Sequence, residues 1–247
     1  DALIGVSMTG IGSAAVLQLD MKEAANIVKA ENRRVAKQIG INQAARTTCV
    51  KPAGTTSLVL GTSSGIHAWH NKYYIRRMRV GKNESIYNYL AKNHPELIQD
   101  EYFRPHDTAV IEIPQAAPKG SIIRTESAFD LLERVKRVAT DWVATGHKTG
   151  SNTHNVSATI SLKEKEWEEA GEWMWKNRNT YNGLSVLPYD GGTYTQAPFE
   201  DITKAKYDEM TKTLQDIDLT KVIEDTDNTD LSGELACAGG SCEITSL

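Results

Sequence analysis

The alternation of apolar and polar positions along the chain predicts three long amphipathic helices. The first begins at an N-cap Asp20, has Glu23 at the capping-box position and ends at Gly40. The second extends from about residue 127 to residue 145, and the third from about 164 to 178. Apolar residues at helical spacing define their expected buried faces: Ala24, Ile27, Val28, Val35 and Ile39; Leu131, Leu132, Val135, Val138, Trp142 and Val143; and Trp167, Ala170 and Met174.

Strand-like runs flank the third helix, at residues 156–160 and 184–187. A strand, a helix and a strand at this spacing form a βαβ unit, which predicts a parallel sheet or barrel. In such folds ligands bind at the carboxyl ends of the strands, so residues 188–192 occupy a candidate position. A β-rich excursion between the first two helices is expected from strands at 73–80 and 108–113.

Composition narrows the classes of function. The 247 residues carry a formal charge of −4, and no basic stripe favours nucleic-acid binding. Arg76, Arg77 and Arg79 are interpreted as a solvated strand face rather than an anion site. No apolar run reaches the length of a membrane span, and no targeting segment precedes the fold, so we expect a cytoplasmic protein with no membrane partner. The chain starts without Met, and we interpret it as part of something longer.

The densest chemical segment follows a short strand that is expected to end near Lys51. Small residues let backbone N–H groups approach an anion, and a helix N-terminus adds a partial positive charge. Hydroxyl side chains add further donors, so the segment has the chemistry of a phosphate cradle, although it is not a Walker A loop. A plain helix N-cap is the alternative. The candidate phosphate-binding residues are Pro52, Ala53, Gly54, Thr55, Thr56 and Ser57.

Two of the three cysteines, Cys237 and Cys242, follow an acidic stretch at 216–234 that is too polar to pack. A thiol pair on a flexible tether can carry reducing equivalents by thiol–disulfide exchange. Half of a zinc site, or no function, are the alternatives. Cys49 is expected to be buried and inert. His67 and His70 have near-metal spacing but no obvious third ligand, so no metal site is predicted.

Several motifs together resemble ribonucleotide reductases, and more narrowly the class II, adenosylcobalamin-dependent enzymes of the monomeric ribonucleoside-triphosphate type. The resemblance spans nearly the whole chain and corresponds to about the carboxyl-terminal third of such an enzyme. Ala53 stands where many relatives have Ser. The motifs lie at residues 47–70, 152–160, 173–175 and 182–192, and at the two tail cysteines.

The resemblance implies an α/β fold: the C-terminal part of a ten-stranded α/β barrel at residues 1–214, with a small β-rich insertion at about 72–124 and a flexible tail at 215–247. It implies that the 52–57 loop binds the phosphates of a ribonucleoside triphosphate. It also implies that Cys237 and Cys242 re-reduce the active-site disulfide and are then reduced by thioredoxin or a similar dithiol. The implied cofactor is adenosylcobalamin. Candidate cofactor contacts rest only on their position at a strand end: Tyr189, Asp190, Gly191 and Gly192.

The departures from the family pattern define the alternatives. The finger-loop motif Asn-Pro-Cys-Gly-Glu, with the radical cysteine, is absent, so we expect it upstream of Asp1, in a part that is fused, split or spliced. The isolated chain is therefore expected to be inactive. A class I large-subunit fragment is one alternative, although a single Tyr189 after Pro188 favours the cobalamin class. A non-catalytic dithiol or zinc-binding module is the other.

Overall fold

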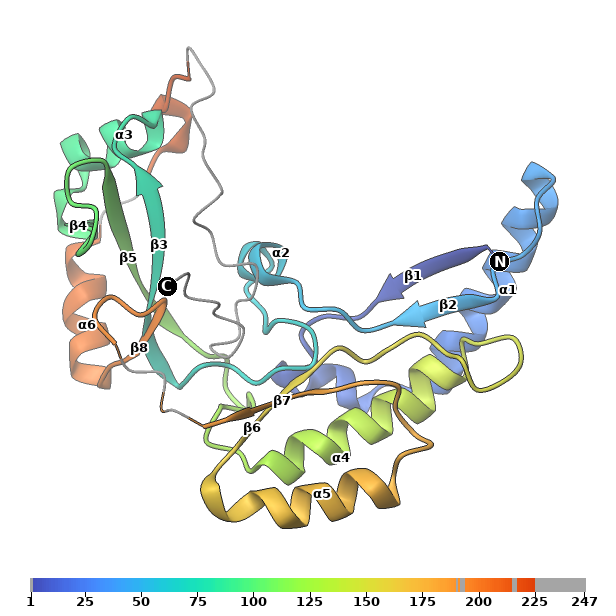
Figure 1. The fold of residues 1–247 in the computed structure, drawn as a ribbon. Helices are drawn as coiled ribbons and strands as arrows, with labels where there is room; N and C mark the ends of the chain where they lie inside the picture. Colours follow the sequence, from blue (N-terminus) through green and yellow to red (C-terminus); the bar gives the residue numbers. More distant parts are fainter. Residues whose placement is uncertain (1, 190, 192–193, 215–216, 225–247) are drawn as a thin grey trace. The chain divides into compact units, whose positions relative to one another are not determined.

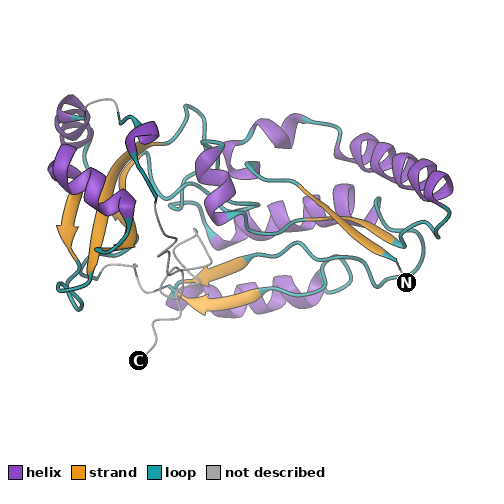
Figure 2. Ribbon diagram, turned by 90° about the horizontal axis from the view of Figure 1, so that it is seen from above, coloured by secondary structure: helices purple, strands orange, loops and turns teal. Residues whose placement is uncertain are grey.

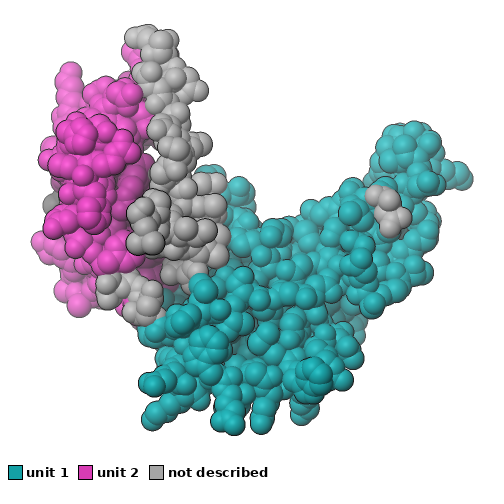
Figure 3. Space-filling view, in the orientation of Figure 1, with its two compact units in different colours: residues 1–69, 119–190, 237–243 teal, residues 70–118, 191–236, 244–247 magenta. Residues whose placement is uncertain are grey.

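The computed structural model describes residues 2–189, 191, 194–214 and 217–224. These residues divide into two compact units, shown in different colours in Figure 3. The first contains residues 2–69 and 119–189, and the second contains residues 70–118 with the described residues between 191 and 224. Among the described helices, none is both long and apolar enough to cross a membrane. The predicted boundary at residue 214 stays a prediction.

Parallel strands form the centre of the first unit. Strand β1 (Leu3–Ser7) pairs in parallel with β2 (Arg46–Cys49), and β6 (Thr159–Leu162) pairs in parallel with β7 (Ser185–Pro188). Val50 joins the two pairs, because its N–H donates to the carbonyl of Asn155 at 3.1 Å and its carbonyl accepts from Ser157 at 2.9 Å. The strand order is therefore β1, β2, β6, β7, and the predicted parallel βαβ unit is confirmed.

Helices connect these strands (Figures 1 and 2). Helix α1 (Met21–Ile39) begins and ends as predicted: the Asp20 side chain accepts from Glu23 N–H, and Gly40 closes the helix at φ 75°. Helix α4 (Ala128–Val138) continues into a π-helical turn, Ala139–Ala144. Helix α5 (Trp167–Lys176) follows a short 3₁₀ turn, Glu164–Glu166. Shorter helical segments are α2 (Gly54–Val59) and the 3₁₀ turns Ile11–Ser13 and Ala15–Gln18.

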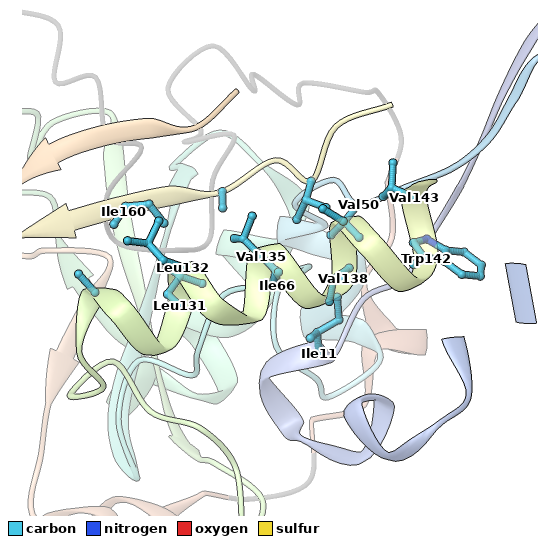
Figure 4. Packing of buried hydrophobic residues seen from close by; sticks show 14 of the residues in the cluster. Ile11, Val50, Ile66, Leu131, Leu132, Val135, Val138, Trp142, Val143 and Ile160 are labelled. Carbon is cyan, nitrogen blue, oxygen red and sulfur yellow. The ribbon is translucent and has the colours of Figure 1, made fainter. Parts of the chain in front are cut away.

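Helix α4 carries the predicted apolar face into the main core (Figure 4). Burying such side chains away from water is the dominant favourable term in folding. Residues from the strands and from the loops after β1 and β2 complete this core. The labelled side chains are Ile11, Val50, Ile66, Leu131, Leu132, Val135, Val138, Trp142, Val143 and Ile160.

Two of the other predicted helix faces are only partly correct. In α1, Ile27 and Ile39 are 62% and 60% exposed, and in α5 Trp167 is 43% exposed, although Ala170 is buried as predicted. Helical spacing predicts which residues share a face, but burial requires a neighbour for that face. Within the described residues β1 has one paired strand, β2, and its five residues are all exposed.

The second unit is an antiparallel sheet with the strand order β4-β5-β3-β8. The long strands β3 (Tyr73–Gly81) and β5 (Thr108–Ala116) pair in register along their whole length, as the β-rich excursion predicted. Short strands β4 (Ile98–Asp100) and β8 (Phe199–Asp201) flank them. The helices are α3 (Ser85–Asn93) and α6 (Lys204–Thr213), with 3₁₀ turns Pro95–Leu97 and Leu219–Lys221.

The basic run in β3 is not the solvated face that the sequence indicated. Arg76 and Arg77 are both 8% exposed. The Arg77 guanidinium donates to Glu112 at 2.6 Å and to Glu200 at 2.5 Å. Arg76 lies 4.4 Å from the ring centroid of Phe199. Because buried charges need partners, the carboxylates of Glu112 and Glu200 explain how Arg77 is tolerated inside a sheet.

A close contact between β2 and the end of the α4 segment yields a stability prediction. Thr48 Oγ1 donates to the Trp142 carbonyl at 2.8 Å, and an added Cβ at Gly146 would lie 2.7 Å from Thr48 Cβ. We expect Gly146→Ala to lower the free energy of unfolding by about 1–3 kcal/mol or more, the usual cost of overpacking. Chemical denaturation followed by circular dichroism measures this change.

Gly171→Ala is the matched control, because an added Cβ in α5 meets nothing within 4 Å. Alanine is the better helix former, so this variant should be unchanged or more stable by up to about 1 kcal/mol. Equal stabilities for the two variants would contradict the proposed steric role of Gly146.

Candidate functional site

The candidate site lies at the carboxyl ends of the parallel strands in the first unit. Ser7 ends β1, and its Oγ accepts the N–H of Lys51, which follows β2. The Lys51 Nζ donates to Ser157 Oγ at 3.2 Å. These bonds link the ends of β1 and β2 to Ser157, which lies two residues before β6. They position the 52–57 loop directly beyond this edge of the sheet.

The 52–57 loop leads into helix α2, a single short helix of six residues. The first turn of any helix leaves its amide groups without intrahelical acceptors, so those groups are open to another acceptor. Ser57 is 2% exposed, and its hydroxyl donates to the Gly54 carbonyl at 3.0 Å. Thr56, by contrast, is exposed. The hydroxyl of Ser57 therefore stabilises the loop from within, and that of Thr56 faces solvent.

A second loop, residues 61–67, is hydrogen-bonded to the 52–57 loop. Ser64 Oγ accepts the N–H of Ala53 at 3.0 Å. Thr9 Oγ1 donates to the Ser63 carbonyl and accepts the N–H of Gly65, each at 3.0 Å. Gly65 has φ +54°, and an added Cβ would lie 2.9 Å from the Lys51 carbonyl, so only glycine fits this crossing. The loop therefore has a fixed backbone before any ligand binds.

His67 connects this supporting loop to β6. Its Nε2 accepts the N–H of Thr159 at 3.2 Å, so the proton of the neutral ring lies on Nδ1. Burial lowers the pKa of His67, and the positive charge of Arg134 lowers it further, against the opposing effect of a hydrogen bond to the Ser64 backbone. His67 is thus a neutral structural link at pH 7.

A buried ion pair anchors the same loop to α4. Arg134 forms two hydrogen bonds to Glu126, at 2.6 and 2.7 Å, and its Nε donates to the Ile66 carbonyl at 3.2 Å. Both side chains are largely buried. Bidentate pairing satisfies the two charges and fixes their geometry. The carbonyl of Ile66 is therefore held from the core side, next to His67.

Sequence reasoning identified the loop but missed its supports. Lys51 and Ser64 lie within the motif at residues 47–70, and Thr9 lies outside the motifs, but only their contacts reveal a supporting role. The one available signal was Lys51 itself, a cation directly before Pro52 in a segment proposed to bind an anion. Lys51 is exposed, and within the described part of the chain it has no carboxylate partner.

Cys49 is 9% exposed at the end of β2, as predicted. Burial raises the pKa of its thiol, against smaller opposing effects from Ser7 and Lys51. A protonated, buried thiol is a poor nucleophile. The tail cysteines, Cys237 and Cys242, lie outside the described residues, and their proposed role stays a prediction.

The candidate cofactor contacts are only partly described. Tyr189 is 49% exposed after β7, and its ring lies 5.7 Å from Lys163 Nζ. Gly191 has φ +80° with open space around it, whereas Asp190 and Gly192 lie outside the described residues. His67 and His70 belong to different units. Among the described residues, no cluster of three or more His, Cys, Asp or Glu could hold a metal ion.

Comparison with known proteins reveals clear relatives, although no protein-family model matches the chain. The adenosylcobalamin-dependent ribonucleoside-triphosphate reductase of Lactobacillus acidophilus is 28% identical over 217 residues, 86% of this chain. The enzyme of the same name from Euglena gracilis is 28% identical over 251 residues, 97% of this chain. The resemblance that the sequence motifs indicated is thus confirmed.

A solved structure supports the fold. The crystal structure of a B12-dependent, class II ribonucleotide reductase matches 85% of this chain with a TM-score of 0.68 and 22% sequence identity. The chain covers 33% of that structure, and 28% and 33% of the two relatives. It is an α/β chain similar to about a third of these enzymes.

The neutral state of His67 yields a prediction about pH. Its pKa is lower in the folded chain than the usual value of about 6.5, so below that pH the unfolded state binds protons more readily. The free energy of unfolding should therefore decrease as the pH is lowered through this window, with a slope of at most about 1.4 kcal/mol per pH unit. In His67→Gln, whose side chain can form both hydrogen bonds, the free energy of unfolding should decrease less. Urea denaturation between pH 7.5 and 5 measures the difference.

Identical pH profiles for the unmodified chain and His67→Gln would show that His67 does not titrate as argued.

Proposed function

We propose that this chain is the carboxyl-terminal part of an adenosylcobalamin-dependent ribonucleoside-triphosphate reductase, acting in the cytoplasm. The observation that carries the proposal is the 52–57 loop at the carboxyl edge of a parallel sheet, in a chain similar to reductases of that name. The overall reaction converts a ribonucleoside triphosphate and two thiols into the 2′-deoxy product, a disulfide and water.

The proposed architecture is a ten-stranded α/β barrel completed by an upstream part of the enzyme. Strand β1 supports this idea, because within the described residues it has one paired neighbour. Leu3, Ile4 and Val6 are 50%, 43% and 40% exposed along that strand. An apolar strand with an open edge is a template for another strand, and an added parallel strand would cover it.

In the proposed mechanism the 52–57 loop binds the triphosphate of the substrate. Its role is positioning: backbone amides of the first turn of α2 and the Thr56 hydroxyl donate to phosphate oxygens, and Lys51 supplies positive charge. Ser57, Ser64 and the Gly65 crossing keep the loop in place. Prior fixation lowers the entropy lost when the substrate binds.

Adenosylcobalamin would supply the radical that starts the reaction, on a cysteine of the upstream part. Tyr189 offers a half-exposed aromatic face to a large planar ligand. We propose Tyr189, Asp190, Gly191 and Gly192 as contacts that orient the cofactor.

The proposed source of electrons is the tail. Removal of the ribose 2′-hydroxyl as water oxidises two active-site thiols to a disulfide. Cys237 and Cys242 would reduce this disulfide by exchange and become a disulfide themselves, which thioredoxin or a similar dithiol then reduces. Cys49 is unsuited to this task, because its thiol is buried and its pKa is raised. Without the upstream cysteines the chain alone should be inactive.

A reductase assay tests the proposal. The chain is joined to the upstream part of its own enzyme and incubated with a ribonucleoside triphosphate, adenosylcobalamin and a dithiol. Deoxynucleotide is expected only with all components present. Cys237→Ser should allow about one turnover and then stop with thioredoxin as reductant, because the active-site disulfide is no longer re-reduced.

Three outcomes would contradict parts of the proposal. Activity without cobalamin would indicate a class I type of reductase. Sustained turnover of Cys237→Ser with thioredoxin would refute the shuttle. One bound zinc per chain, lost in Cys237→Ser, would favour the metal-binding alternative. Cys49→Ser is the control, and it should leave turnover unchanged.

The phosphate loop yields a separate prediction in the same joined enzyme. Thr56→Val removes an exposed hydroxyl but keeps the shape of the side chain. It should raise KM for the substrate about fivefold, the loss of one hydrogen bond of about 1 kcal/mol. Thr140→Val is the matched control, since its hydroxyl donates to Lys136 on α4, away from the loop. Equal KM values for both variants would argue against the loop as the phosphate site.

A further inference from the structure

A cavity lies at the opposite, amino-terminal end of β1 and β2. Its volume is about 800 Å³, and all of its lining residues belong to the first unit. Three backbone segments form a continuous base: Ala45 N–H donates to the Ala2 carbonyl at 2.8 Å, and Lys148 N–H donates to the Ala45 carbonyl at 3.0 Å. Helix α1 forms one wall through Arg33, Ala36 and Lys37. The cavity is therefore built by hydrogen-bonded main chain and one helix.

Positive charge dominates the lining. Arg33, Lys37 and Lys148 all face this cavity, and no carboxylate among the described residues lines it. Within the described part of the chain, none of these three side chains forms an ion pair or a hydrogen bond. Arg33 and Lys37 are also four residues apart on α1, where like charges destabilise a helix. Arg33, Lys37 and Lys148 are exposed to solvent, so the fold does not need a counter-charge for them, and their convergence on one cavity creates a positive potential that attracts an anion.

Arg46, next to the lining, adds a further positive charge. Arg46 follows Ala45, and His147 precedes Lys148, and these two residues form a backbone bridge. Arg46 Nε and both ring nitrogens of His147 are buried without a hydrogen-bond partner among the described residues. Buried polar atoms are normally satisfied, so this end of the sheet has donor capacity that the described fold does not use.

The fold itself accounts for only part of this arrangement. Cations in the last turn of a helix interact favourably with its carbonyl end, which explains Lys37 at the end of α1. That effect declines within the last turn, so it does not explain Arg33. It also does not explain Lys148, which comes from a different segment. Arg33, Lys37 and Lys148 thus line the same cavity, and none of them has an ion-pair partner among the described residues.

We propose that this cavity binds a polyphosphate of two or three phosphate groups, either free or as part of a nucleotide. Three cations match a multiply charged anion, and the volume falls within the usual range for small-molecule sites. Asn42 and Gln43 offer amide groups, and Ala36 and Ile41 offer apolar surface for an uncharged portion. The site is distinct from the 52–57 loop, which lies at the carboxyl edge of the same strands.

Isothermal titration calorimetry on the chain at low ionic strength tests the proposal, with ATP and sodium tripolyphosphate as probes. Each probe should bind, and the affinity should decrease with added salt. The double variant Lys37→Gln with Lys148→Gln should weaken binding about tenfold or more, by removing two of three cations. The control, Lys165→Gln with Lys176→Gln, has the same change of charge at exposed positions outside the cavity and should bind as the unmodified chain does.

The outcomes separate the possibilities. Tighter binding of ATP identifies a nucleotide site, and equal binding of both probes identifies a site for the phosphates alone. The double variant Lys37→Gln with Lys148→Gln is also made in a Lys51→Gln background, which weakens any binding at the 52–57 loop, and the tenfold loss should persist there. Absence of binding, equal effects of the two double variants, or a loss seen only with Lys51→Gln would overturn the proposal.

Discussion

The pairing of Val50 with residues 155–157 is the constraint on which the first unit depends. Two backbone hydrogen bonds at this residue join β1 and β2 to β6 and β7, so two pairs of strands become one parallel sheet. Val50 itself is fully buried against α4, which combines backbone pairing and apolar burial at one position. This junction therefore positions the segment directly after β2, including the 52–57 loop.

A chain of neutral hydrogen bonds then fixes the 52–57 loop, and the Arg134–Glu126 ion pair adds a contact to the supporting loop at the Ile66 carbonyl. Ala53 bonds to Ser64, the Ser64 backbone bonds to His67, and His67 accepts from Thr159 at the start of β6. The path therefore starts at the loop and returns to the sheet. Networks of this kind rigidify a site when all members are satisfied. A loop held by neutral contacts presents its amides to a ligand without competing anions nearby.

Sequence alone predicted those features that depend on local chemistry. The caps Asp20 and Gly40 act within a few residues of their own helix, so their effect is readable from spacing. The exposure of Ile27 was not predictable in this way, because it depends on whether another element covers this side chain. Arg77 was misjudged for the same reason: Glu112 and Glu200 are 35 and 123 residues away in the chain. Ser64 and Thr9, which support the candidate loop, likewise act across the fold. The basic cavity combines three distant segments and has no sequence signature.

The treatment of positive charge separates structural cations from those available to ligands. Arg77 and Arg134 are buried, and each is neutralised by carboxylates at 2.5–2.7 Å. Lys51 at the carboxyl edge, and Lys37 and Lys148 at the amino-terminal end, have no such partner in the described part of the chain. A cation that stabilises a fold must be paired because burial makes its charge costly. A cation that binds an anion gains from staying unpaired and partly hydrated until the ligand arrives, since a competing carboxylate would have to be displaced. Lys51, Lys37 and Lys148 lie at the two ends of one sheet, and these are the places where we propose that the chain accepts negative charge.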